Sequence, residues 1–120
     1  MTPYDEALDW VRHHPEAPEA LGLAKLILSL HHPAYAFSFR ECTDGMRDAR
    51  MALSLRVVGQ FVRIGREDES MLAAACTVAE WYPVLTRRAE QMEEAKQAIE
   101  ALAESEGEVD QRRADDPEIA

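Results

Sequence analysis

Residues 18–30 read PEALGLAKLILSL, and this stretch decides the fold. Its leucine, isoleucine and alanine side chains fall on nearly every side of a helix and leave only a narrow stripe of Gly22, Lys25 and Ser29. A helix that is apolar almost all round is buried among other elements. The stretch therefore predicts a helix in the middle of a helical bundle.

The segments on both sides of this stretch carry further helix signals. Thr2 precedes a proline at the first helical position, and Gly65 and Pro83 end two runs of apolar residues at helical spacing. The remaining helices are expected at residues 3–13, 44–64, 68–82 and 84–104. We expect the helix at 44–64 to be central too. The predicted core consists of Leu26, Ile27, Leu30, Leu53, Val57, Phe61, Ile64, Leu72, Leu85 and Met92.

The length and composition fit one globular domain, with 120 residues of which 47% are hydrophobic and 30% charged. We predict an all-α, single-domain bundle of about five helices over residues 1–104. Residues 105–120 contain almost nothing apolar, so we expect a disordered acidic tail there. The longest apolar run, residues 20–30, is about half the ~20 residues that a membrane span needs. We therefore expect a cytoplasmic protein that does not enter a membrane.

An aromatic segment separates the second and third predicted helices. Tyr35, Phe37 and Phe39 alternate with small residues, and a period of two is typical of extended backbone. One interpretation is an extended connector that lays the three rings across the core. The other is an exposed aromatic ridge that docks a partner or pairs edge to edge in a homodimer.

The charge of the chain is unevenly distributed. The net charge is −10, yet residues 40–66 hold six arginines against three acids. Arg56 and Arg63 lie seven residues apart on one face of a helix, with Gln60 between them. This arginine stripe either pairs with acids of the first or fifth predicted helix, docks a protein, or contacts nucleic-acid phosphates.

The C-terminal third has the opposite charge. Residues 80–120 hold twelve acids against five bases, and Glu90, Glu93 and Glu94 belong to the fifth predicted helix. A row of carboxylates on a helix can imitate a phosphate backbone and occupy a basic groove on another protein, as inhibitors carried by phages and mobile elements do. The other interpretation is a solvated helix face that continues into a solubilising tail.

The fifth predicted helix also carries a heptad pattern. Leu85, Met92 and Ile99 are seven residues apart, and Ala95 and Leu102 each follow three residues after Met92 and Ile99. This pattern covers about two and a half heptads, which is too short to predict a coiled coil from sequence alone.

Signatures of catalysis, of a cofactor or of a metal site are absent from the sequence. The five glycines never cluster into a phosphate-binding loop, and the two cysteines form no CxxC pair. The four histidines form two adjacent pairs, 13–14 and 31–32. Neighbours on a helix point about 100° apart, so neither pair can chelate one ion as i,i+4 ligands do. We therefore predict a protein that is not an enzyme and holds no cofactor or metal.

The function predicted from these patterns is the binding of another protein, as an adaptor or inhibitor. The alternative is a nucleic-acid-associated helical subunit that contacts phosphates through the arginine stripe. The candidate interaction residues are Tyr35, Phe37, Phe39, Arg56, Gln60, Arg63, Glu90, Glu93 and Glu94.

Overall fold

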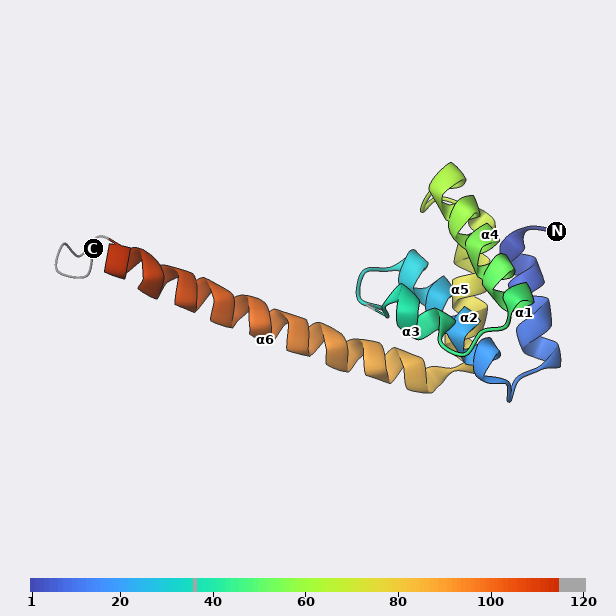
Figure 1. The fold of residues 1–120 in the computed structure, drawn as a ribbon, viewed down its shortest axis with the longest axis horizontal. Helices are drawn as coiled ribbons and strands as arrows, with labels where there is room; N and C mark the ends of the chain where they lie inside the picture. The colour runs from blue at the N-terminus through green and yellow to red at the C-terminus, as the bar shows by residue number, and fades with distance from the viewer. Residues whose placement is uncertain (36, 115–120) are drawn as a thin grey trace.

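The computed structural model describes residues 1–35 and 37–114, and all regular structure in these residues is helical. The helices are α1 (Pro3–His13), α2 (Pro18–His31), α3 (Phe39–Thr43), α4 (Asp48–Ile64), α5 (Glu69–Trp81) and α6 (Pro83–Ala114). Helices α1–α5 pack together, and α6 projects from them as a long arm (Figure 1). The predicted all-α bundle is confirmed, with the short helix α3 added at the end of the aromatic segment. No helix in the described part of the chain is long and apolar enough to cross a membrane.

Helix α2 is the centre of the packed part, as its all-round apolar sequence predicted. It contacts α1, α3, α4 and α5, and its residues Leu23, Ile27 and Leu28 are completely buried. Helix α4, which we also expected to be central, instead packs only its inner face against α1 and α2. Its apolar arc is wider than its neighbours cover, so Leu55 and Val62 remain exposed to solvent.

Most of the predicted core residues are buried or pack against the buried core, but two of them are exposed. Ile64 is 51% exposed because it is the last residue of α4. Leu72 is 40% exposed because α5 turns its neighbour Met71 toward the core instead. The face of α5 that enters the core is therefore offset by one residue from the predicted face.

Local side-chain chemistry sets the ends of several helices. The hydroxyl of Thr2 accepts a hydrogen bond from the backbone nitrogen of Asp5, and the Asp5 carboxylate accepts one from the backbone nitrogen of Thr2. Ser38 caps α3 through its hydroxyl alone, which accepts a hydrogen bond from the backbone nitrogen of Glu41 at 3.1 Å. Gly45, at φ +71°, lies in the turn that ends α3 and delays the start of α4 to Asp48.

A glycine allows α2 and α3 to approach each other closely. A Cβ atom built on Gly22 would overlap the backbone carbonyl oxygen of Cys42 and touch the end of the Met46 side chain. Residues 39–43 can therefore lie directly on the central helix, with Cys42 buried between them. This contact brings Glu41 next to α2.

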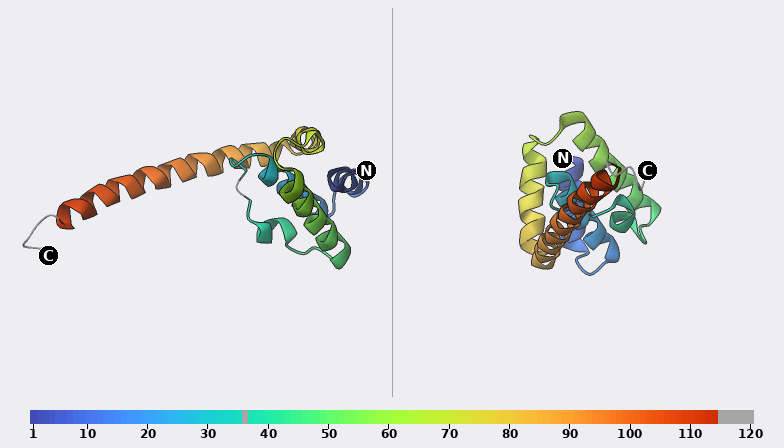
Figure 2. Two further views of the ribbon diagram at one scale, coloured as in Figure 1. Left: turned by 90° about the horizontal axis from the view of Figure 1, so that it is seen from above. Right: turned by 90° about the vertical axis from the view of Figure 1, so that its left-hand side faces the viewer.

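Helix α6 is attached to the packed part only at its root. Leu85 and Ala89 are buried there, and Met92 is partly buried against the core. Beyond the root the helix extends away from α1–α5, as the left-hand view in Figure 2 shows. It continues ten residues past position 104, where we expected the helix to end. The remainder of the predicted tail, residues 115–120, lies outside the described residues.

Candidate functional site

The three aromatic residues of the predicted ridge do not share one surface. Phe37 is buried, Tyr35 is partly buried against the core, and Phe39 is 46% exposed at the start of α3. The alternation of rings along the chain stops where α3 begins, so the third ring does not continue the pattern. The interpretation of the three rings as an exposed ridge is therefore wrong, and Phe37 in particular is too buried to contact a partner.

The arginine stripe is also divided. Arg56 donates to the carboxylate of Glu6 in α1 at 3.0 Å, which confirms one of the internal pairings that the sequence suggested. Gln60 does not face solvent between the arginines but is buried, and its amide donates to Asp68 at 3.1 Å. Arg63 donates to the side-chain oxygen of Gln60. The predicted pairing with the fifth predicted helix is not formed, because α4 packs on α1 and α2 rather than on α6.

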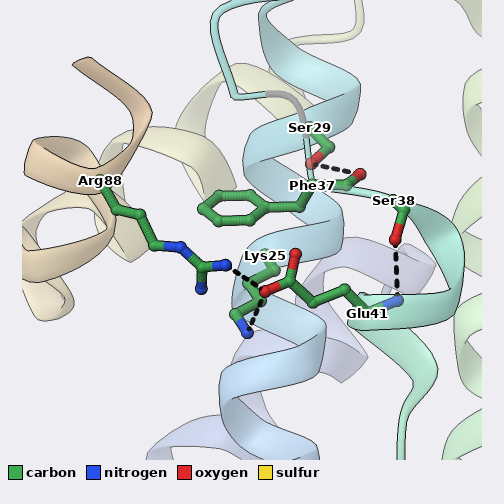
Figure 3. Close-up of polar contacts among 6 residues, drawn as sticks. All are labelled: Lys25, Ser29, Phe37, Ser38, Glu41 and Arg88. Atoms are coloured by element: carbon green, nitrogen blue, oxygen red, sulfur yellow. Dashed lines mark hydrogen bonds and ion pairs between the residues drawn. The ribbon is translucent and has the colours of Figure 1, made fainter. Parts of the chain in front are cut away.

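Three charged residues from distant parts of the chain form a clasp at the root of α6. The carboxylate of Glu41 in α3 accepts hydrogen bonds from Arg88 in α6 and from Lys25 in α2, the latter at 3.3 Å (Figure 3). The Arg88 guanidinium also lies over the Phe37 ring, 5.3 Å from its centroid. The clasp of Lys25, Glu41 and Arg88 therefore holds α2, α3 and α6 together.

The clasp changes the acidity of its carboxyl group. Partial burial by itself raises the pKa of Glu41, but the hydrogen bonds from Arg88 and Lys25 outweigh this effect and lower the pKa below its ordinary value. The carboxylate is thus held in its charged form. Sequence reasoning did not single out Glu41, although Lys25, the only charged residue between positions 20 and 30, indicated the need for a partner.

The lowered pKa of Glu41 predicts how stability depends on pH. Because the folded-state pKa lies below the ordinary value of 4.5, the contribution of the clasp is complete above about pH 4.5 and is lost as pH falls through the folded-state pKa. Urea unfolding should show Glu41→Gln less stable than wild type at neutral pH, with the difference shrinking in acid. The exposed Glu16→Gln is the matched control. A difference that grows toward acid would contradict the clasp.

The predicted acidic residues come together with Tyr35 in one groove. An open groove of about 540 Å³ lies between the root of α6 and the segment that follows α2. It is lined by His31, His32, Ala34, Tyr35, Thr86, Ala89, Glu90, Glu93, Glu94 and Gln97. We call this feature the acidic groove. It unites four of the nine predicted interaction residues, and the other five lie elsewhere.

Glu90, Glu93 and Glu94 form no ion pair within the described residues, and Arg88 of the preceding turn is engaged by Glu41. His31 and His32 line the same groove. Glu93 only accepts a weak hydrogen bond from the amide of Gln97 at 3.4 Å. The groove is therefore an exposed concentration of negative charge beside an aromatic ring.

The thiol and imidazole groups offer little for chemistry. Cys42 is buried, and this burial raises the pKa of its thiol to about 11, so that the nucleophilic thiolate is disfavoured. His13 and His14 direct their Nδ1 atoms to backbone carbonyls of α1. Within residues 1–35 and 37–114, no group of three or more histidine, cysteine or acidic side chains is arranged to hold a metal ion.

No family model, curated protein or solved structure matches this chain.

Proposed function

We propose that this protein is not an enzyme and acts by binding a basic segment of another protein in the acidic groove. The observation that carries the proposal is the gathering of Glu90, Glu93 and Glu94 beside Tyr35 in an open groove, where none of the three carboxylates forms an ion pair within the described residues. The chain as a whole has a net charge of −10, which attracts positively charged partners over longer distances.

The side chains of the acidic groove suit lysine and arginine. Carboxylates accept charge-assisted hydrogen bonds from guanidinium and ammonium groups, and an aromatic face such as Tyr35 attracts the same cations. The exposed positions of Glu90 and Glu94 keep both groups hydrated until a ligand arrives. Binding of this kind supplies selectivity and a fast association rate, and it weakens as salt increases.

If the basic surface of the partner normally binds nucleic acid, this protein would inhibit that binding by occupying the same surface. The acids of α6 continue beyond the groove with Glu100 and Glu104, so the helix presents a long row of negative charge. Such a row competes with a phosphate backbone for the same lysines and arginines. The nucleic-acid-binding alternative has less support, because Arg56 is paired with Glu6 and Arg63 with Gln60.

The test is a binding titration with a labelled arginine-rich peptide as the probe. The triple variant Glu90→Gln/Glu93→Gln/Glu94→Gln should bind the peptide roughly 10-fold more weakly than wild type. This loss corresponds to three surface ion pairs of ordinary strength between the peptide and the groove. The control is Glu16→Gln/Glu67→Gln/Glu80→Gln, which has the same net charge but leaves the groove intact. The control should bind nearly as well as wild type. Equal losses in both variants would show general charge attraction and refute the groove.

A pull-down from host lysate extends the test to natural partners. We expect proteins that remain bound after nuclease treatment and that are lost with the groove variant but not with its control. If nuclease removes every partner, the nucleic-acid alternative becomes the better explanation.

A further inference from the structure

The projecting part of α6 carries an apolar seam that the described structure covers only at its first residue, Met92. Met92, Ala95, Ile99 and Leu102 follow one another at spacings of three and four residues, which places them along one side of the helix. Ile99 is 66% exposed and Leu102 is 63% exposed. We call these four residues the α6 seam. It starts at the packed root, where Met92 touches the core, and extends into solvent.

Within residues 90–106, the projecting helix forms none of the ion pairs that support an isolated helix in water. Glu90 and Glu94, and likewise Glu100 and Glu104, are like charges four residues apart, which destabilise a helix. Lys96 is the only base between positions 89 and 106. Helices in proteins owe most of their stability to the packing of an apolar face. The α6 seam therefore requires a covering surface.

The residues that flank the α6 seam point to the identity of this cover. In heptad terms the seam occupies positions a and d, and charges at positions e and g select the partner helix. The flanking residues here are Gln91, Lys96, Ala98, Ala103 and Ser105. A basic partner helix is not favoured, because there is no row of carboxylates beside the seam with which its lysines and arginines could pair. A second copy would meet mostly small, uncharged side chains that allow close approach.

The acids of α6 are placed so that they do not oppose such pairing. Glu90, Glu93, Glu94, Glu100 and Glu104 occupy heptad positions b, c and f, which face away from the seam. Glu106 stands at the next seam position and ends the apolar run. Two strongly acidic helices can therefore pair along the seam with their carboxylates in solvent.

We propose that two copies of this chain pair through the α6 seam. The acidic groove lies on the opposite side of α6 and remains open in the pair, since its glutamates occupy the outward positions. The dimer would thus present two acidic grooves. The dimer does not depend on the proposed function, because different faces of the helix carry the two proposals.

Sedimentation equilibrium of the full chain tests this proposal over a range of concentrations. The average molecular mass of wild type should rise with concentration from the 13.5 kDa of one chain toward twice that mass. Ile99→Asp/Leu102→Asp would place charges in the seam and weaken pairing at least ~100-fold. Both side chains are exposed in the single copy, so the packed helices α1–α5 should remain folded in the variant, while the unpaired arm loses part of its helical circular dichroism.

The matched control is Glu100→Gln/Glu104→Gln, which changes two outward-facing acids of the same helix. This control should dimerise at least as well as wild type, because it only removes repulsion. A wild-type chain that keeps the mass of one copy up to millimolar concentration would overturn the proposal. So would a seam variant that dimerises like wild type. Either result would leave the peptide titration of the groove unaffected.

Discussion

Replacing Gly22 with alanine is expected to lower the free energy of unfolding by about 2–3 kcal/mol. In an open helix position the same change would be favourable, because alanine has a higher helix propensity than glycine. At Gly22, however, the added Cβ would overlap the backbone carbonyl oxygen of Cys42. A backbone atom cannot rotate away as a side-chain end can, so α3 would have to move off α2. The displacement would also separate Glu41 from Lys25.

Urea unfolding followed by circular dichroism measures this effect, and Gly59→Ala is the matched control. Gly59 lies within α4, and a Cβ built there meets nothing within 4 Å. The control should therefore stabilise the protein by about 0.5–1 kcal/mol. The two glycine substitutions have opposite expected signs. A Gly22→Ala protein as stable as wild type would mean that α3 does not lie directly on α2.

Truncating Ile27 to alanine is expected to cost about 2–5 kcal/mol, the range for removing an aliphatic side chain from a packed core. Ile27 is completely buried in α2, the helix that the other four packed helices surround or contact. No neighbour can close the resulting cavity without moving a helix. For a domain of this length, such a loss lowers the melting temperature by roughly 10 °C or more.

Phe61→Ala provides the comparison for the Ile27 result. Sequence reasoning placed Phe61 in the core, but the structure leaves it only partly buried against the core at the outer helix α4. We therefore expect Phe61→Ala to cost less than Ile27→Ala, although phenylalanine is the larger side chain. If thermal unfolding ranks the two substitutions in the opposite order, α4 rather than α2 is the central helix.

The sequence predicted those parts of the fold that depend on neighbouring residues. The all-round apolar character of residues 18–30 located the central helix, and Thr2 followed by a proline located the start of α1. The position of α4 could not be obtained in this way. Its apolar arc is wide enough for a central helix, and only the packing of α1 and α2 decides which part of the arc is covered.

The candidate site likewise has a part that local sequence predicted and a part that depends on tertiary packing. Glu90, Glu93 and Glu94 were recognised because they are close in sequence and share a helix. Their meeting with Tyr35 depends on how α6 leaves the packed helices, which no local pattern encodes. The clasp shows the limit most clearly, because Glu41 is separated from Lys25 by 16 positions and from Arg88 by 47.

The long arm formed by α6 also governs how the protein behaves in solution. The radius of gyration is 19.1 Å, and the molecule measures 66 × 29 × 27 Å. A compact chain of this length would have a radius of gyration of roughly 14 Å. Gel filtration separates by hydrodynamic radius, so even a single copy should elute earlier than globular standards of its mass. An early elution peak would therefore reflect the reach of α6 and could not be taken as a count of subunits.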